Sequence, residues 1–433
     1  MAARVVIVGG GFAAIEAAAA VRALAGELAA VTVVAPNAQL ESRPMSVTAL
    51  FEPSQTAPIA LAALAERVSC TLRRGALERV DADRHVLRLA GGDELPYEAL
   101  LIATGAIRQP AFPGAITFAG AQDAPAVAEA VAAPGHVAFV SPTPSTWSLP
   151  LYELALLSAQ QHPEASVAVV TVEATPLWVF GVEAGEAVRE LFVRHGIALL
   201  TGERVLAAAD GELELDDAAP VSADRAVALP QLAGPDLAGL PSDDAGFLVV
   251  DAHCAVRGVA DVYAAGDVTA FPLKQGGLAA QQADAAAAAI AAKLGAAVEP
   301  RPFAPVLRGL LLTGGAPLYI RSDGAHGSSH RLAHTVVSSE ALWWPPAKVA
   351  GRYLAPLLRG DDASEPLHDL LEAPPEPENA GELALMLAQE DADRGDYAAA
   401  LRVLDTAQAL NGTLPVEWQR MRTLWQARAQ WSA

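Results

Sequence analysis

Three consecutive glycines, beginning at Gly9, follow a short apolar run near the start of the chain. The run Val5–Val8 predicts a buried parallel strand, and the alanine-rich stretch 13–28 predicts the helix after it. Gly9 lets the backbone turn, Gly11 lets it approach a pyrophosphate, and Ala14 keeps the helix close to the strand. The N-terminus of that helix offers free N–H groups to phosphates. We therefore expect a dinucleotide-binding turn, and the alternative is an ordinary strand-to-helix turn without a ligand.

The composition limits the class of protein. The 433 residues suffice for two or three domains, and a hydrophobic content of 52% excludes a largely disordered chain. The formal net charge of −21 disfavours nucleic acid and anionic lipid as partners. Cys70 and Cys254 are the two cysteines, which excludes a disulfide framework and fits a reducing compartment. No uninterrupted apolar run reaches about 18 residues, so we expect a cytoplasmic protein without a transmembrane segment.

A second predicted strand, 31–34, ends in Pro36 and Asn37. Dinucleotide-binding folds usually carry an acidic residue there for the adenosine ribose, and this chain has none. The ribose must then be held by Asn37 or by backbone groups, and both alternatives stay open. The loop that follows contains Arg43 and Pro44, which we expect close to the cofactor, with a solvated loop arginine as the alternative for Arg43.

Two later strand ends carry polar or small residues. One buried strand closes on Thr104 and Gly105, and another closes on Asp267. Lys274 and Gln275 then open a long alanine-rich helix. An acidic residue after a buried strand, followed by glycines at a helix start, suits the ribitol and pyrophosphate of a polar cofactor.

A second strand-and-helix unit begins at the predicted strand 137–140, but its turn lacks glycine. Prolines and bulky residues fill the segment 141–150, so close backbone approach to a second pyrophosphate is not expected. We predict an α/β fold with two Rossmann-like three-layer domains, a β-containing C-terminal region and a helical tail. The predicted boundaries are 1–115 with 237–300 for the first nucleotide-binding domain, 116–236 for the second Rossmann-like domain, 301–355 for a C-terminal interface region and 356–433 for the tail.

The glycine-rich first strand, the Ala103-Thr104-Gly105 strand end and the Ala264–Asp267 strand end occur in a specific order and spacing. In this the chain resembles the FAD-dependent pyridine nucleotide-disulfide oxidoreductase superfamily, with its glutathione-reductase-like fold. The segments 150–155 and 176–181 resemble the sulfide:quinone oxidoreductase and flavocytochrome c sulfide dehydrogenase branch. The resemblance implies FAD as the cofactor. The residues expected to bind it are Gly9, Gly11, Phe12, Ala13, Ala14, Pro36, Asn37, Arg43, Pro44, Leu77, Thr104, Gly105, Gly266, Asp267, Lys274 and Gln275.

The same resemblance implies catalytic positions. Lys274 would approach the isoalloxazine, where a cation or a helix dipole stabilises negative charge on the reduced flavin. Gln281 and Gln282 are candidates for the acceptor site, because quinone-reducing relatives use glutamines on this helix. Trp343, Trp344 and Lys348 lie in the C-terminal segment that covers the flavin or forms the dimer in this family. The alternatives are a surface lysine, helix-surface glutamines and a tryptophan that packs in an interface.

The departures from the family pattern concern sulfur chemistry. Disulfide reductases carry a Cys-x4-Cys pair where this chain has 40–45, without cysteine. Cys70 and Cys254 are predicted to be buried structural thiols, so sulfide oxidation by the usual route is not expected. We expect an FAD-dependent oxidoreductase that passes two electrons from a small donor to a quinone or another small acceptor, as a homodimer. The alternative is a flavin-binding scaffold that acts through its C-terminal helices.

Three other patterns concern metal binding, helical repeats and membrane contact. His326, His330 and His334 recur every four residues, but the Gly-Ser-Ser between them favours a flexible insertion over a metal site. The segment 395–407 resembles half of a tetratricopeptide repeat. A single repeat cannot form a solenoid, so we expect a helical hairpin that packs on the body of the protein or on the other subunit of a dimer. In the closing helix Trp418, Met421 and Trp425 share one face, whereas Trp431 breaks the spacing. We expect that face to pack on protein, and the alternative is peripheral contact with a bilayer.

Overall fold

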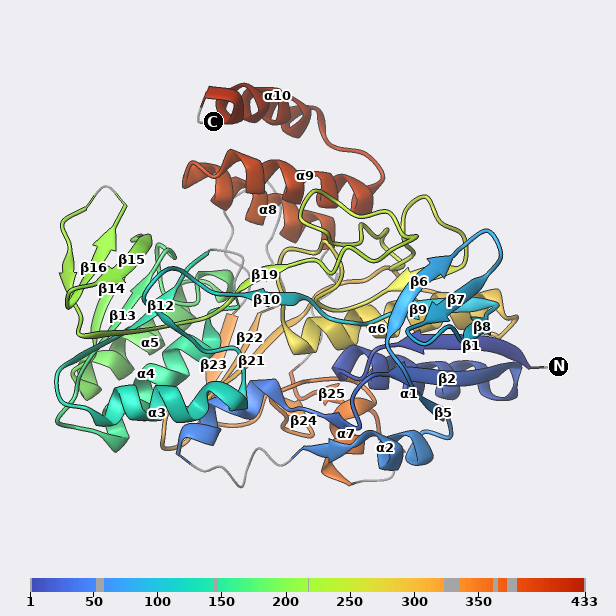
Figure 1. The fold of residues 1–433 in the computed structure, drawn as a ribbon, viewed down its shortest axis with the longest axis horizontal. Coiled ribbons are helices and arrows are strands. Elements are labelled where there is room, and N and C mark those ends of the chain that lie inside the picture. The colour runs from blue at the N-terminus through green and yellow to red at the C-terminus, as the bar shows by residue number, and fades with distance from the viewer. Residues whose placement is uncertain are drawn as a thin grey trace.

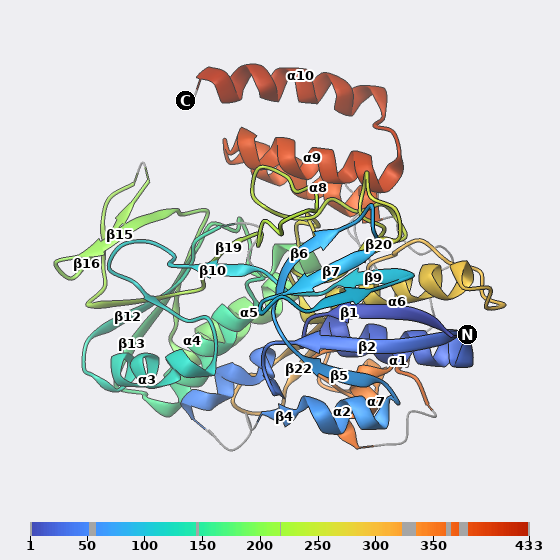
Figure 2. The same cartoon turned by 45° about the vertical axis from the view of Figure 1, so that its right-hand side comes forward.

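The computed structural model describes residues 2–51, 58–143, 147–216, 218–322, 335–360, 365–371 and 380–431. Two five-stranded parallel sheets lie in two halves of the molecule, side by side in Figure 1. Three C-terminal helices cover one end of both halves in both views (Figures 1 and 2): α8 (Ala380–Asp393), α9 (Tyr397–Asn411) and α10 (Val416–Trp431). The α/β fold with two Rossmann-like halves and a helical tail is therefore confirmed, while the exact domain boundaries remain predictions.

The first sheet is buried on both faces. Its order is β20 (Val262–Ala264), β9 (Ala99–Ile102), β1 (Ala3–Val8), β2 (Ala29–Ala35) and β5 (Thr71–Arg74). Along β1, Val5 and Ile7 join the core formed with α1 (Phe12–Ala25) and α6 (Gly276–Lys293). Val6 and Val8 join a second core, to which the antiparallel sheet of β6 (Leu77–Asp81), β7 (Val86–Leu89) and β8 (Glu94–Pro96) contributes. This double burial explains the uninterrupted apolar run, and alanines let α1 and α6 pack closely.

The second sheet repeats this three-layer arrangement. Its order is β11 (Ile116–Thr117), β18 (Arg225–Ala228), β12 (His136–Ser141), β13 (Ser166–Thr171) and β14 (Ala198–Thr201). One face contacts the helices α3 (Ala124–Ala132), α4 (Leu149–Gln161) and α5 (Val182–His195). The other face packs on the antiparallel sheet of β15 (Val205–Ala209), β16 (Glu212–Leu215) and β17 (Val221–Ser222). The alternation is visible in β12, where Val137 and Phe139 face the helices and Ala138 and Val140 face the small sheet.

Two chain crossings connect the halves. β10 (Ile107–Gln109) and β19 (Gln231–Ala233) run antiparallel between them (Figure 1). Shorter elements complete this part of the fold: β3 (Gln39–Leu40), β4 (Ile59–Ala60), α2 (Leu61–Arg67), and the 3₁₀ helices η1 (Gly26–Leu28), η2 (Arg43–Leu50), η4 (Ala121–Asp123) and η5 (Trp178–Phe180).

The C-terminal region closes over both halves. It contains the antiparallel sheet of β21 (Leu307–Leu311), β22 (Leu318–Ser322) and β23 (Thr335–Ser338), the pair β24 (Trp343–Trp344) and β25 (His368–Asp369), and the helix α7 (Leu354–Arg359). In α10, Trp425 is buried and its ring centroid lies 6.1 Å from that of Trp418. Together with Met421 these rings pack on the protein core, as their spacing predicted. Within the described ranges, no helix is both long and apolar enough to span a bilayer.

Three segments differ from what their sequence patterns alone would predict. The alternating stretch 69–89 would predict a β-hairpin, but β5 pairs in parallel with β2 and extends the first sheet. The apolar stretch 246–251 would predict a strand, but it forms only isolated bridges, at Leu248 and Val250. The segment that carries Arg43 and Pro44 would predict an irregular loop, but it forms the helix η2. His326, His330 and His334 lie outside the described residues, as does the side chain of Trp431.

Candidate functional site

A cavity of about 500 Å³ lies at the carboxyl ends of strands from both sheets. This is the edge of an α/β sheet at which ligands bind. The predicted cofactor residues that line the cavity are Gly9, Gly11, Phe12, Ala13, Pro36, Asn37, Arg43, Pro44, Leu77, Thr104, Gly105, Gly266, Asp267, Lys274 and Gln275. Ala14 does not line it: its side chain is fully buried in the core, as expected of a residue that keeps the helix close to the strand.

The glycine turn after β1 has a conformation and a spacing that need glycine. Gly9 has φ of +143°, and a Cβ at this position would lie 2.1 Å from the carbonyl oxygen of Ala103. Gly11 stands at the N-cap of α1, and a Cβ added there would meet nothing within 4 Å. A glycine N-cap has no side chain to occupy the first N–H groups of the helix. The turn therefore fits a pyrophosphate at the helix N-terminus.

Asp267 lines the cavity together with two cations whose charges act on it. Burial raises the pKa of its carboxyl, while the charges of Lys274 and Arg43 oppose this rise. Burial also lowers the pKa of Lys274 to about 8, against the charges of Asp267 and Asp243. The Lys274 ammonium donates to the Thr269 carbonyl oxygen and lies 3.9 Å from the ring centroid of Phe247. Lys274 is thus a partly buried cation fixed at the cavity wall rather than a free surface lysine.

Gln275 and Gln282 are engaged within the protein. The Gln275 side chain caps α6 by accepting from the Leu278 N–H at 2.7 Å, and it donates to the Arg308 carbonyl oxygen at 2.9 Å. Gln282 is buried and accepts from the Gly266 N–H at 2.8 Å. Gln282 therefore supports the strand end that carries Asp267, and this contact replaces the acceptor-site role considered for it.

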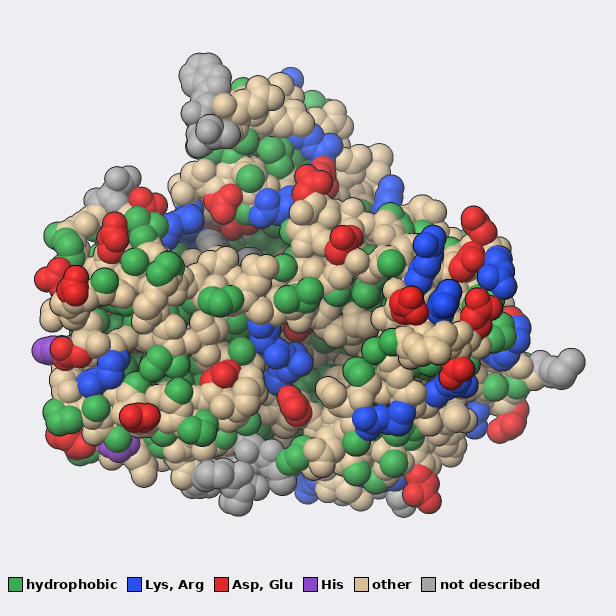
Figure 3. All heavy atoms as spheres, viewed as in Figure 1, with side chains coloured by type: hydrophobic (Ala, Val, Ile, Leu, Met, Phe, Trp, Pro, Cys, Tyr) green, Lys and Arg blue, Asp and Glu red, His purple; other side chains and the backbone are tan. Residues whose placement is uncertain are grey.

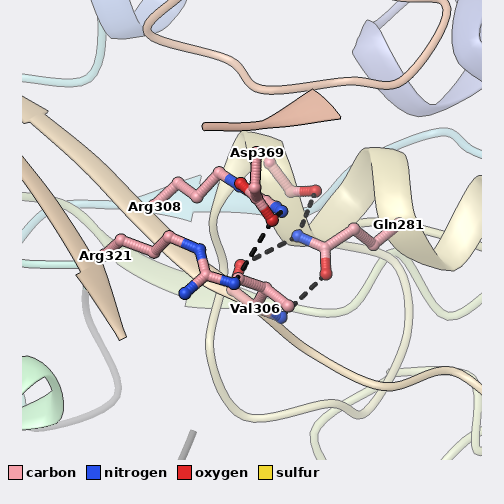
Figure 4. Close-up of polar contacts among 6 residues, drawn as sticks. Gln281, Val306, Arg308, Arg321 and Asp369 are labelled. Carbon is pink, nitrogen blue, oxygen red and sulfur yellow. Dashed lines mark hydrogen bonds and ion pairs between the residues drawn. The ribbon is translucent and has the colours of Figure 1, made fainter. Parts of the chain in front are cut away.

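Gln281 and Trp344 lie outside the cavity, contrary to the placement expected from the sequence. The Gln281 amide donates to the Val306 carbonyl oxygen at 2.9 Å and accepts from the Val306 N–H at 2.8 Å, so it joins α6 to the start of β21 (Figure 4). Trp344 is 40% exposed, and the Arg359 guanidinium lies 4.5 Å from its ring centroid. The tryptophan that packs inward is Trp343, against Tyr319.

Arg308 links the cavity to the C-terminal region. Its guanidinium makes a two-point contact with Asp369 at 2.8 and 2.7 Å, and Arg321 donates to the same carboxylate at 3.3 Å (Figure 4). Burial favours a raised pKa for Asp369, but the hydrogen bonds and charges of the two arginines outweigh it and lower this pKa. The charge of Arg308 is therefore compensated away from the cavity.

Lys348, expected in the segment that covers the cofactor, lies at the cavity, but its ion pair with Glu153 was not predicted. Lys348 lines the cavity and contacts Glu153, which is fully buried in α4 and also accepts from the Leu312 N–H at 2.8 Å. Burial raises the pKa of Glu153 against the Lys348 charge, and burial lowers the pKa of Lys348 against the Glu153 charge. A lone carboxylate in the apolar run 149–157 was the sequence feature that could have pointed to a buried partner.

Sulfur chemistry has no place in the cavity wall. Neither Cys70 nor Cys254 lines the cavity, and both thiols are free. Burial raises the pKa of Cys70 to about 11 and raises that of Cys254 further. Cys254 is completely buried, as predicted, whereas Cys70 is only partly so. Thiols that hold their proton are poor nucleophiles.

Comparisons with known proteins agree with this geometry. The sequence profile of the pyridine nucleotide-disulphide oxidoreductase family matches residues 3–138 and 152–291. No curated protein sequence matches the chain. The structure resembles the sulfide:quinone oxidoreductase of Aquifex aeolicus, with 18% identity, a TM-score of 0.71, and coverage of 87% of this chain and 100% of that one. It also resembles a ferredoxin reductase of Rhodopseudomonas palustris (19% identity, TM-score 0.58, 74% and 82% covered) and an NAD-dependent persulfide reductase of A. fulgidus (19%, 0.56, 74% and 64%). At these identities the likeness is one of fold.

Proposed function

The chain belongs to the pyridine nucleotide-disulphide oxidoreductase family and is a flavin-dependent oxidoreductase, and from this premise we propose that it holds FAD in the cavity between its two halves. We further propose that it passes two electrons from a small donor to a small acceptor, for which a quinone is one candidate. FAD would supply the two-electron chemistry, and the protein would supply binding, orientation and electrostatics.

The observation that carries the proposal is the convergence of three strand ends on one cavity. The glycine turn at Gly9, the Thr104-Gly105 pair and Asp267 are far apart in sequence, and all line the cavity. The turn offers N–H groups to a pyrophosphate, and Asp267 offers a carboxylate to hydroxyl groups of a ribitol chain. One extended, polar dinucleotide accounts for all three.

The charges on the cavity wall support redox chemistry. Lys274 and the N-terminus of α6 line it, and both favour negative charge nearby. The Glu153–Lys348 pair can hold a proton at the wall, because burial moves the two pKa values toward each other. We assign the stabilisation of negative charge to Lys274 and the N-terminus of α6. We assign the holding of a proton to the Glu153–Lys348 pair.

The positions of the two cysteines support an electron donor that is oxidised without the participation of protein thiols. Neither lies at the cavity, and free cysteines suit the reducing compartment that we propose, the cytoplasm. The homodimer stays a prediction.

The test is spectroscopic. We expect the purified protein to be yellow, to release FAD on denaturation, and to bleach near 450 nm when an anaerobic panel of small reductants includes its donor. A colourless protein that does not take up added FAD would refute the proposal. A flavin that stays oxidised with every donor, in a stable complex with another protein, would favour the scaffold alternative.

A further inference from the structure

The family name implies a pyridine nucleotide, and the second Rossmann-like half is the place where this fold would bind one. A dinucleotide in such a half needs a glycine turn with free N–H groups after one strand and a carboxylate for its ribose after the neighbouring strand. In this half the two strands are β12 and β13, which pair in parallel. The residues at their carboxyl ends therefore decide whether NAD(P)H fits.

The turn after β12 does not offer the groups that bind a pyrophosphate. No glycine occurs in the segment 141–150, which leads from β12 into α4. Pro150, the second residue of α4, has no N–H group, and the N–H of Leu151 donates to the Ser148 carbonyl oxygen at 2.9 Å. The N-terminus of α4 therefore lacks the free N–H groups and the close backbone approach that the N-terminus of α1 provides.

The carboxylate after β13 is already engaged. Glu173 closely follows this strand, where a Rossmann-like half offers a carboxylate to a ribose. Ser148 donates to one of its oxygens at 2.9 Å, and Tyr152 and Thr171 donate to the other. Glu173 is only 3% exposed, and burial raises the pKa of its carboxyl against these hydrogen bonds. Hydroxyl groups of the protein thus take the place of ribose hydroxyl groups.

The helical tail lies against the same strand end. Arg394 of α8 donates from Nε to the Val172 carbonyl oxygen at 2.9 Å, and its charge acts on Glu173. The tail is also joined to the first half, since Thr406 of α9 donates to the Ala270 carbonyl oxygen at 3.2 Å. The described residues that line the cavity include none from the end of β13. The protein itself therefore closes off this strand end.

The charge of the second half is unfavourable for phosphates. Residues 116–236 contain sixteen Asp and Glu residues, four arginines and no lysine. Figure 3 shows acidic side chains spread over this half on one face, whereas Lys and Arg side chains gather near the middle, between the two halves. Phosphates are attracted to cations and repelled by carboxylates. The cations of this face thus favour one dinucleotide in the cavity over a second one along β12 and β13.

The part of the second half that does line the cavity is apolar. Its largest side chains there are Phe118, Trp147, Leu149, Leu229 and Leu232. The N–H groups of Phe118 and Leu229 are engaged, because they donate to the carbonyl oxygens of Ala228 and Val140 at 2.8 and 3.1 Å. This wall can contact a small molecule, but it offers little to hold a nucleotide.

We propose that the second half does not bind NAD(P)H, and that the electron donor is a small molecule without a nucleotide that enters the cavity directly. Glu173 serves inside the protein instead, where it joins α4 to the strand end on which α8 docks. The proposal rests on the proposed function only in that the electrons are delivered to FAD.

Anaerobic titration of the purified full-length protein tests this proposal. NADH and NADPH at up to about 1 mM, the upper end of ordinary KM values, should leave the 450 nm band of the flavin unchanged. Dithionite should bleach the same band, which shows that the flavin can be reduced. Calorimetric titration with NAD⁺ and with ADP-ribose should give no binding beyond what excess FAD displaces.

Bleaching that saturates with NADH or NADPH would overturn the proposal. Saturable binding of NAD⁺ or ADP-ribose that FAD does not displace would overturn it as well. Binding that FAD does displace belongs to the glycine turn after β1 and leaves the proposal intact. A colourless protein that takes up no FAD would refute the proposed function, whereas the calorimetric result still decides whether the second half binds a nucleotide.

Urea unfolding tests the internal role of Glu173. We expect Glu173→Gln and Arg394→Gln each to lower the urea midpoint, and the double variant to lower it by less than the sum, because the charge of Arg394 acts on Glu173. Tyr152→Phe, which removes one donor to Glu173 and keeps the ring, takes the place of Glu173→Gln if that variant does not fold. Arg194→Gln, at an exposed arginine in the last turn of α5, is the matched control and should combine additively. Additive shifts for the Arg394 pair would overturn this role.

Discussion

A buried pair of carboxyl groups joins α1 to the C-terminal region and offers a quantitative test of the structure. Glu16 in α1 is fully buried and accepts from the N–H groups of Tyr353 and Leu354 at 2.8 and 2.7 Å. Burial raises its pKa to about 7, although those backbone hydrogen bonds and one to Asp284 oppose the rise. Burial and the charge of Glu16 raise the pKa of Asp284 well above its ordinary value, and Arg352 opposes this.

The sign of the pH dependence follows from linkage. The ordinary pKa of 4.5 applies to Glu16 in the unfolded chain, and about 7 applies in the folded protein. Between these values the folded state binds more protons, so stability is greatest below pH 4.5 and is lost as the pH rises toward 7. At 1.36 kcal/mol per pKa unit the whole loss is about 3.4 kcal/mol, of which about 2 kcal/mol falls between pH 5.5 and pH 8.

The perturbation is Glu16→Gln, which keeps the shape and removes the titration. Gln offers one acceptor in place of two, so this variant loses a backbone hydrogen bond at every pH, a cost of about 1 kcal/mol. We expect the difference in unfolding free energy between parent and variant to change by at least about 2 kcal/mol in favour of the variant between pH 5.5 and pH 8, because removing the Glu16 charge also brings down the raised pKa of Asp284. Urea unfolding followed by tryptophan fluorescence measures it.

The matched control is Glu27→Gln, because the Glu27 side chain is 99% exposed and its removal changes the net charge equally. Its difference from the parent should stay constant across the same pH range. If the Glu16→Gln difference were equally constant, Glu16 would not be a buried carboxyl with a raised pKa. The buried contact between Glu16 of α1 and the start of α7 would then be refuted.

Three further predictions follow from the cavity. Gly9→Ala should fold with little or no bound flavin, because its Cβ would lie 2.1 Å from the Ala103 carbonyl oxygen. The ratio of absorbance at 450 and 280 nm measures the bound flavin, and a normal ratio would contradict the turn geometry. Glu153→Gln and Lys348→Met should each lower the free energy of unfolding by about 3–5 kcal/mol, and the double variant by less than the sum; additive losses would argue against a direct pair. Cys70→Ser should reduce its flavin at the parent rate in stopped-flow measurements, since this thiol does not line the cavity; a large loss of rate would restore thiol chemistry.

The two sheets could be predicted because their signals are local. The strand β1, the turn at Gly9 and the helix α1 form one continuous segment. Its apolar residues fit a buried strand, its glycines fit the turn, and its alanines fit a closely packed helix. The residues Thr104 and Asp267 stand out because each follows a buried apolar strand. Parallel strands place such carboxyl ends at one edge, so a cavity at that edge was foreseeable without contact information.

The glutamines of α6 show where local reasoning fails. Gln281 and Gln282 are adjacent on one helix, and the sequence gives no means of telling which side chain meets a backbone group. Gln281 contacts Val306, which follows α6 in the sequence, whereas Gln282 contacts the N–H of Gly266, which precedes α6. Such contacts depend on how β21 returns over α6, which no periodicity encodes.

The C-terminal region decides the chemistry of the cavity in the same nonlocal way. Lys348 reaches Glu153 across 195 positions of sequence, and Asp369 reaches Arg308 across 61. Each contact compensates a cation at the cavity wall, and each joins segments that are far apart in the sequence, so local patterns do not reveal it. The charge of the cavity wall therefore depends on where the C-terminal region places Lys348 and Asp369.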